Sequence, residues 1–215
     1  MGGGAVEGTF RRVAGDDSLR LIETLGWDGA VFPREERHLA RLTRAAARFG
    51  WRCDGAAAAL RAAAPQGPAR MRLTLAATGA IEVTASPLPP GKPIWRLGLA
   101  EARLASDDPW LQVKSSRRAA YDAARAALPP GLDEVVFLNE RGEVCDGTIT
   151  TLFFDAGDGL RTPPLTSGLL PGVLREEMLA QGRCREAVLH AADLGRVQLW
   201  LGNSLRGLVR ADWAG

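Results

Sequence analysis

The sequence predicts a mixed α/β (α+β) chain arranged in two lobes. Segments with strand and helix periodicity follow one another without strict β–α–β alternation. Of the 215 residues, 46% are hydrophobic, which is enough for one sizeable core or two smaller ones. A proline-rich connection over 87–93 and a stretch without clear period over 103–112 interrupt the pattern. We therefore expect a small α+β lobe over residues 1–105 and a larger α/β lobe over residues 106–215.

The first strand and the first helix of the small lobe have clear signals. Polar and apolar residues alternate over 19–25, which predicts a strand. Pro33 suits the first position of a helix, and Glu35 and Glu36 suit the positive end of the helix dipole. Apolar residues follow at helical spacing until Gly50, a residue type that commonly ends helices. We expect the first helix between these signals.

Shorter elements complete the small lobe. Asp54 is suited to cap a second helix over 55–64, which Pro65 stops. Alternation over 70–77, a Thr-Gly turn and a returning strand over 81–84 together predict a β-hairpin.

The remainder of the chain mixes strands with two helices. Ser115 or Ser116 is suited to cap a helix over 117–128, and a Pro-Gly pair leads into a second helix over 173–179. Strands are expected over 94–99, 134–138, 143–145, 150–155, 160–162, 187–189 and 197–201.

Charge and composition disfavour several functions. The formal net charge of +2 argues against nucleic acid or a membrane surface as the main partner. Arginines cluster over 34–52, but glutamates interrupt them, and a solvated helix face is the favoured interpretation. The three cysteines form no CxxC pair and only two histidines accompany them, so no metal site is expected. Widely spaced cysteines fit a reducing compartment, and we expect a cytoplasmic protein.

Three common nucleotide-binding and hydrolase motifs are missing from the sequence. It has no GxGxxG that opens a helix, no GxxxxGK[ST] and no GxSxG. Dinucleotide-binding, nucleoside-triphosphate-binding and serine-hydrolase functions are therefore disfavoured.

Lysine is rare in this chain. Of the 27 lysine and arginine residues, only Lys92 and Lys114 are lysines. Lys92 lies in the proline-rich connection, where a solvated charge is the ordinary interpretation. Lys114 follows the apolar residues Leu111 and Val113 and precedes a predicted helix. It is therefore a candidate for chemistry that needs a primary amine able to lose its proton, which arginine cannot provide.

Several short segments, taken in their order along the chain, resemble one family. They are IETL at 22–25, HLARL at 38–42, VKSSRRAAY at 113–121, DEVVFLN at 133–139, GEVCDG at 142–147, TLF at 151–153, TPP at 162–164, GLLPGVLR at 168–175 and GNSLRG at 202–207. From about residue 19 to 210 the chain resembles the class IV aminotransferases, which include branched-chain aminotransferases, D-amino-acid aminotransferases and aminodeoxychorismate lyases. The resemblance implies a two-lobed, D-amino-acid aminotransferase-like fold with pyridoxal 5'-phosphate in the cleft between the lobes. It also implies a homodimer that acts on a small-molecule amino substrate.

The resemblance assigns roles to three charged residues. Lys114 matches the lysine that binds the cofactor as a Schiff base; the alternative is an ordinary lysine at a helix start. Asp146 matches the acid that keeps the pyridine nitrogen protonated. The family usually has glutamate there, and the alternative is a turn aspartate before Gly147. Arg41 matches an arginine that binds the cofactor phosphate; the alternative is a solvated helix arginine.

Further contacts to the cofactor and substrate are implied by the same resemblance. The family binds phosphate with the first amides of a helix, which are those of Val173 and Leu174 here. Ser204 matches a position that contacts phosphate through a hydroxyl or small residue. The alternatives are a turn before a core helix and a turn at a strand end. Arg72 and Arg103 are candidates for binding a substrate carboxylate, although a surface or structural role is the favoured interpretation of each.

Three functions remain open at this level. The segment 203–207 is closer in style to the lyase branch, which favours 4-amino-4-deoxychorismate lyase, an enzyme of folate biosynthesis that forms 4-aminobenzoate and pyruvate. An amino-acid aminotransferase would use the same residues. A degenerate, non-catalytic homologue is the third, because Asp146, Thr151 and Leu174 depart from the usual family residues and the chain is shorter than typical members. An arginine-rich RNA-binding protein is a remote alternative.

Overall fold

The structure, a computed structural model, describes residue 10 and residues 13–215. The chain divides into two compact units, which are described one at a time. Unit 1 comprises Met1–Pro90 together with Val113–Arg117, and unit 2 comprises Gly91–Gln112 together with Arg118–Gly215. No helix of the described part of the chain is both long enough and apolar enough to cross a membrane.

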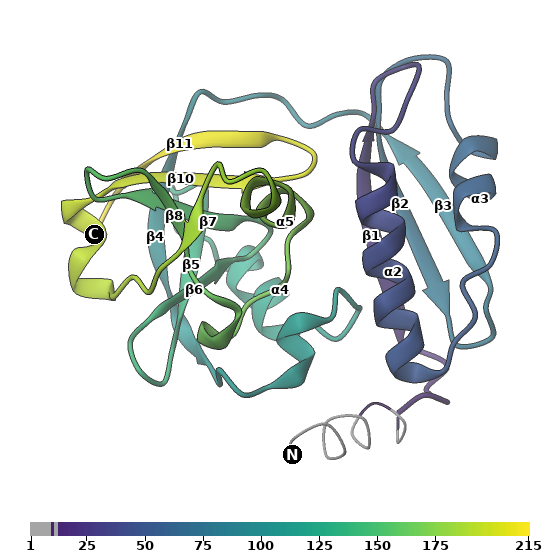
Figure 1. The fold of residues 1–215 in the computed structure, drawn as a ribbon, viewed down its shortest axis with the longest axis horizontal. Coiled ribbons are helices and arrows are strands. Elements are labelled where there is room, and N and C mark those ends of the chain that lie inside the picture. Colours follow the sequence, from purple (N-terminus) through teal and green to yellow (C-terminus); the bar gives the residue numbers. More distant parts are fainter. Residues whose placement is uncertain (1–9, 11–12) are drawn as a thin grey trace. The chain divides into compact units, whose positions relative to one another are not determined.

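From residue 13 on, unit 1 is a three-stranded antiparallel sheet with two helices (Figure 1). α2 packs mainly against β1, and α3 packs against β2 and β3. The alternation of β2 puts Met71, Leu73 and Leu75 in the core, where Leu42 of α2 and Leu60 of α3 are also buried. The elements are β1 (Arg20–Trp27), α2 (Glu35–Phe49), α3 (Ala56–Ala62), β2 (Ala69–Ala76) and β3 (Ile81–Ser86).

The predicted acidic start and glycine end of the first helix are confirmed, but Pro33 is not its first residue, because Arg34 precedes Glu35 in a left-handed turn with a φ of 63°. Glu35 and Glu36 form its first turn, and Gly50 ends it with a φ of 70°. Glycine adopts this left-handed conformation without the steric penalty of a Cβ, and the Gly50 N–H then bonds to the carbonyls of Ala46 and Ala47. The predicted cap of the second helix is wrong: Gly55 precedes α3, while the Asp54 carboxylate pairs with Arg52.

Unit 2 is built on an eight-stranded mixed sheet in the order β10-β11-β4-β5-β6-β7-β8-β9. A further antiparallel pairing between β10 and β7 closes six of these strands into a ring. The strands are β4 (Ile94–Leu104), β5 (Glu134–Asn139), β6 (Val144–Gly147), β7 (Thr151–Asp155), β8 (Leu160–Thr162), β9 (Arg185–Glu186), β10 (Gln198–Asn203) and β11 (Gly207–Trp213).

The helices of unit 2 are short. The α-helices are α4 (Ala119–Ala126) and α5 (Val173–Ala180), and the 3-10 helices are η1 (Pro109–Gln112), η2 (Leu165–Ser167) and η3 (Ala191–Arg196). The largest core cluster is apolar and combines residues of β4, β5, β7 and β10, among them Leu97, Val136, Leu152 and Leu201. Because β5 is buried along its whole length, it reads as a continuous apolar run after Glu134.

The boundary between the units differs from the one expected at residues 105 and 106. β4 pairs in parallel with β5 and β11, so residues 94–104 belong to unit 2. Conversely, Val113–Arg117 runs beside β1 and belongs to unit 1, so Lys114 lies in the smaller unit and not in the larger one as expected. Local periodicity does not show with which sheet a segment pairs, which explains both corrections. The strand expected over 187–189 is also wrong, since β9 ends at Glu186.

Candidate active site

Lys114 lies beside the edge strand β1 of the unit 1 sheet. Its carbonyl accepts a hydrogen bond from the Ile22 N–H at 2.8 Å, and the next residue, Ser115, forms an antiparallel bridge with Leu21. Opposite residues of such a bridge share a face of the sheet, so Lys114 lies on the face of Ile22. The strand therefore fixes the backbone that carries the amine.

The same face of the sheet carries one of the two candidate substrate arginines. In the register of unit 1, Thr24 pairs with Arg72, and Ile22 pairs with Thr74. Because faces alternate along a strand, Arg72 shares its face with Ile22 and hence with Lys114. Arg72 is half-buried on this face, whereas its neighbours in β2 on the other face are buried.

The opposite face of β1 contributes a buried acid to a charged cluster with α2. Glu23 accepts hydrogen bonds from Arg41 through both oxygens, at 2.8 Å from Nε and 2.7 Å from Nη2. His38, one helical turn before Arg41, has its Nδ1 2.6 Å from Oε2 of Glu23. All three side chains are buried. The i, i+3 spacing on α2 brings both residues to the same carboxylate.

The charges of this cluster are fixed by its contacts. Burial alone would raise the pKa of Glu23, but the Arg41 charge and the bonds from His38 and Arg41 outweigh it and lower the pKa to about 2. The pKa of His38 is lowered, first by burial, against the influence of Glu23; the positive charges of Arg41 and Lys114 add to this. His38 is thus neutral and donates its Nδ1 proton to Glu23. Lys114 is near enough to act on His38 electrostatically.

In unit 2, a row of paired residues crosses three strands. Asp146 of β6 pairs with Thr151 of β7, and Thr151 pairs with Gly202 of β10. The first helical turn of α5 lies against the same row: a Cβ added to Gly172 would be 2.8 Å from Thr151 Oγ1, and one added to Gly202 would be 2.8 Å from Leu174 Cδ2. The structure therefore brings the predicted acid and the predicted phosphate-binding helix start to one place.

Asp146 is a buried acid whose hydrogen bonding is incomplete. Its side chain is 6% exposed, and its Oδ1 has no hydrogen-bond partner among the described residues. Burial raises the pKa of Asp146 to about 7, although the Thr151 hydroxyl, the Arg175 charge and the Leu170 N–H lower it in part. A buried acceptor without a donor is costly, so it marks a place where a ligand's donor would be stabilising.

Glu134 holds the turn that connects β6 with β7. It is 0% exposed and accepts hydrogen bonds from the hydroxyls of Thr148 and Thr150, at 2.5 and 3.0 Å. The N–H groups of Thr148 and Ile149 bond to the same carboxylate. Because this turn lies between Asp146 and Thr151 in the chain, Glu134 positions both.

The amides of Val173 and Leu174 begin α5. As the first residues of a helix, their N–H groups have no acceptor within the helix itself, and such groups favour anions. Both side chains are buried, which fixes the helix start. The structure agrees with the expectation that Leu174 offers no hydroxyl here.

Ser204 lies in the turn between β10 and β11. Its neighbour Asn203 shapes this turn: the Asn203 Oδ1 accepts bonds from the N–H groups of Leu205 and Arg206, and its Nδ2 donates to the Ile149 carbonyl at 3.1 Å. Since Gly202 pairs with Thr151, the turn that contains Ser204 follows directly after the row that contains Asp146.

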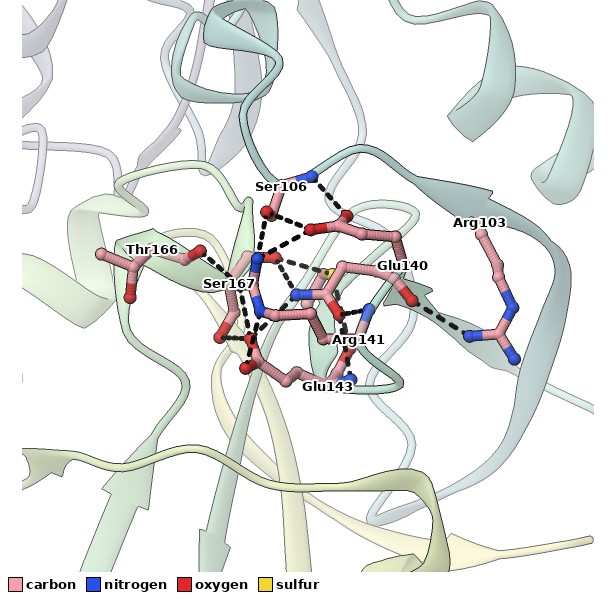
Figure 2. Close-up of polar contacts among 9 residues, drawn as sticks. Arg103, Ser106, Glu140, Arg141, Glu143, Thr166 and Ser167 are labelled. Carbon is pink, nitrogen blue, oxygen red and sulfur yellow. Dashed lines mark hydrogen bonds and ion pairs between the residues drawn. The ribbon is translucent and has the colours of Figure 1, made fainter. Parts of the chain in front are cut away.

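Arg141 supports this region from the β5–β6 hairpin. Figure 2 shows its guanidinium between Glu140 and Glu143. The Arg141 Nη2 lies 2.8 Å from Glu143 Oε2. It also donates to the Thr166 carbonyl, and Ser167 bonds to Glu143 at 2.8 Å. These bonds tie η2 to the hairpin. The residues after η2 include Leu170, the backbone donor to Asp146.

Arg103, the second candidate substrate arginine, lies at the edge of the group drawn in Figure 2, and a dashed line joins its guanidinium to that group. Its Nη1 donates to the Asn139 carbonyl at 3.0 Å, across the pairing of β4 with β5. This contact gives Arg103 a role in the sheet. The other lysine, Lys92, has a side chain that is 51% exposed, as expected for a solvated charge, and it forms an ion pair with Asp133, just before β5, at 2.6 Å.

Three buried side chains of the site were not identified from the sequence: Glu23, His38 and Glu134. Each had a signal. Glu23 interrupts the apolar residues of an alternating strand, and His38 shares a helix face with Arg41. Glu134 begins a strand that is otherwise apolar. A charged residue at a core position requires a partner, so the three positions were available as candidates.

The residues of each unit suit pyridoxal phosphate. In unit 2, the buried Oδ1 of Asp146 needs a donor, and a protonated pyridine nitrogen would provide one. The α5 start and the turn at Ser204 lie close to that acid and would offer donors to a phosphate. In unit 1, a lysine with a fixed backbone lies near a buried arginine.

Known proteins share this chain's sequence and fold. The family described as amino-transferase class IV matches residues 20–212. A crystal structure from Mesorhizobium loti, provisionally assigned as an amino-acid aminotransferase, is 45% identical, with a TM-score of 0.87 over 92% of this chain and 100% of that one. No curated protein sequence matches the chain.

Two other solved structures extend the comparison. A hypothetical aminotransferase from Mycobacterium tuberculosis, in its PLP-bound form, is 26% identical, with a TM-score of 0.71 over 91% of this chain and 81% of that one. A 4-amino-4-deoxychorismate lyase from Pseudomonas aeruginosa is 24% identical, with a TM-score of 0.77 over 90% and 82% of the respective chains. At this identity the lyase shows the fold alone.

Proposed function

Because the chain belongs to the class IV aminotransferase family and is a pyridoxal-phosphate-dependent enzyme, we propose that Lys114 carries the cofactor covalently and that Asp146 faces its pyridine nitrogen. The observation that carries this proposal is the buried Oδ1 of Asp146, which has no partner among the described residues. When bound, the cofactor supplies an electron-withdrawing ring that stabilises negative charge on the substrate carbon next to the amine.

Asp146 keeps a proton at the ring nitrogen. With a pKa of about 7, its carboxyl is poised to share a proton, and a positive charge on the ring would favour the carboxylate. Aspartate is one methylene shorter than the glutamate that the family usually has, and the Thr151 hydroxyl supports the shorter side chain.

Lys114 has two roles in this proposal. Its Nζ would hold the cofactor, and the same amine would accept and return a substrate proton. Arg41, the amides of Val173 and Leu174, and the Ser204 hydroxyl bind the phosphate. Arg72, on the face of Lys114, binds a substrate carboxylate.

The first candidate reaction is that of 4-amino-4-deoxychorismate lyase, which forms 4-aminobenzoate and pyruvate. The 203–207 segment favours it through its likeness to the lyase branch, and the bond from Asn203 to the Ile149 carbonyl holds this turn in place. The second candidate is an amino-acid aminotransferase, which the 45% identity to the Mesorhizobium loti protein favours.

The two reactions differ in their need for an acceptor. A lyase releases pyruvate from 4-amino-4-deoxychorismate alone, and a coupled lactate dehydrogenase assay would detect it. An aminotransferase requires a keto acid, so turnover of an amino acid only when 2-oxoglutarate or pyruvate is added would reject the lyase. A loaded enzyme without either activity would reject both and favour a non-catalytic homologue.

The cofactor attachment has its own test. Protein incubated with pyridoxal phosphate is reduced with borohydride, digested and mapped by mass spectrometry. We expect the pyridoxyl label on Lys114, its loss in Lys114→Arg, and its retention in the matched control Lys92→Arg. A label confined to Lys92 or to the amino terminus would contradict the proposal.

We also propose that the enzyme is a homodimer acting on a small-molecule amino substrate, as the family resemblance suggests. Light scattering after size exclusion, at several protein concentrations, tests the assembly. A mass of one chain throughout would reject the dimer.

A further inference from the structure

Glu23 is a buried carboxylate that the proposed function leaves without a role. It lies in the middle of β1, is 2% exposed, and faces α2. A charge at such a position is strongly destabilising unless partners compensate it. The sheet pattern alone would place an apolar residue here, as at Leu21 and Leu25.

Glu23 contacts the polar ends of two side chains of α2. Its two oxygens receive Nε and Nη2 of Arg41, and one of them also receives Nδ1 of His38. A two-point contact of this kind fixes both the position and the plane of a guanidinium. A single point contact would leave the plane free to rotate.

We propose that Glu23 is a positioning residue that presets the Arg41 guanidinium for the cofactor phosphate, with His38 as the second anchor of the carboxylate. This inference rests on the proposed function, because it gives Arg41 the phosphate. An arginine side chain loses substantial rotamer freedom when it binds a ligand, and a side chain that is already held loses less.

The electrostatic surroundings are consistent with this role. Among the described residues, Arg41 and His38 on α2 are the charged and titratable groups that lower the pKa of Glu23, and Lys114 beside β1 acts on His38. The Glu23 carboxylate compensates the buried Arg41 charge in the absence of phosphate. The guanidinium is therefore kept in place before the ligand arrives.

Comparing the affinities for two ligands that differ only in the phosphate group tests the proposal without an activity assay. Cofactor-free protein is titrated with pyridoxal 5'-phosphate and, separately, with pyridoxal, which lacks the phosphate, and the absorbance change is followed. In Glu23→Gln, the new amide places a donor against the donors of Arg41 and His38. We expect the affinity for pyridoxal phosphate to fall about 10- to 100-fold, the range typical when a residue that orients a metal ligand is lost. The affinity for pyridoxal should stay within about 3-fold.

Two further variants complete the experiment. Glu82→Gln makes the same change on the exposed side of β3 and should bind both ligands like the wild type. Arg41→Lys keeps the positive charge but cannot form the two-point contact, and it should lose affinity for pyridoxal phosphate selectively. If Glu23→Gln fails to fold, Glu23→Asp, which keeps the carboxylate but shortens its reach to Arg41, decides the question.

The outcomes separate the inference from the proposed function. Equal weakening of both ligands, or no weakening, in the deciding variant overturns the positioning role. If the wild type binds pyridoxal phosphate no better than pyridoxal, or carries no label on Lys114, the proposed function itself fails. Selective loss in Glu23→Gln and Arg41→Lys, with the Glu82 variant unchanged, supports the inference.

Discussion

Thr151 and Asp146 are register partners on β7 and β6, and the Thr151 hydroxyl is a hydrogen-bond donor to the buried Asp146 carboxyl. Both positions are among those at which this sequence departs from the usual family residues. The two departures are therefore adjacent, and the shorter acid is supported by the Thr151 hydroxyl. Because the two residues contact each other, the two departures alter one hydrogen bond and are not independent losses of function.

The first prediction concerns Asp146 in cofactor-free protein. Its pKa is raised from 3.8 to about 7, so the folded state keeps the proton while the unfolded state loses it. Stability therefore falls as pH rises from about 4 to 7, by an amount on the order of 4 kcal/mol at 1.36 kcal/mol per unit. Asp146→Asn removes this titration. Its Tm advantage over wild type should grow by several degrees between pH 4 and pH 8 in thermal scans; a difference that is independent of pH would contradict the prediction.

The second prediction concerns Thr151. Thr151→Val keeps the shape of the side chain but removes the donor, so the pKa of Asp146 should rise further, by about one unit or more for a bond to a charged group. The pH at which cofactor-free stability levels off should move upward in the same thermal scans. Thr162→Val is the control. It also removes a buried hydroxyl, the one bonded to the Leu152 carbonyl, but it should not shift this pH. Equal pH profiles for the two variants would show that Thr151 does not act on Asp146.

The third prediction concerns Glu134, which stabilises the β6–β7 turn through hydrogen bonds and also raises the pKa of Asp146 through its charge. Glu134→Gln weakens the bonds to Thr148 and Thr150, so the free energy of unfolding should fall by about 2–4 kcal/mol. The same change removes a negative charge that raises the pKa of Asp146, so the pH dependence described for Asp146 should shift downward. Urea unfolding between pH 4 and pH 8 measures both. A loss of stability without a downward shift would reject the electrostatic part alone.

Much of the fold follows from the sequence because local patterns encode it. The first helix ends at Gly50, where the pattern placed its end, since a left-handed terminus requires a residue without Cβ. The hairpin of β2 and β3 is likewise present. The division into units is different: Lys114 pairs with β1, some 90 residues earlier in the chain, through backbone bonds that no side-chain pattern reveals.

The site was predictable to a different extent in each unit. Asp146, Val173 and Leu174 came from the family resemblance, and the structure brings them together around Thr151. The supporting residues Glu23 and Glu134 were missed, because a buried carboxylate is recognised only when its partners are known. Those partners are 15 and 18 residues away for Glu23, and 14 to 16 residues away for Glu134.

The last prediction concerns the packing of β10 against α5. A Cβ on Gly202 would be 2.8 Å from Leu174 Cδ2 and 3.0 Å from the Gly207 carbonyl oxygen. Of these two atoms, only the leucine methyl can move easily. Gly202→Ala should therefore cost about 1–3 kcal/mol of stability, as overpacking of a dense core does. It should also lower the affinity for pyridoxal phosphate more than the affinity for pyridoxal, because the displaced atoms belong to the α5 start and to the turn that contains Ser204. Gly91→Ala, where a Cβ meets nothing within 4 Å, is the matched control and should change neither property. Urea unfolding and the two cofactor titrations measure these effects, and a Gly202→Ala protein with wild-type stability would show that the contact is looser than the structure has it.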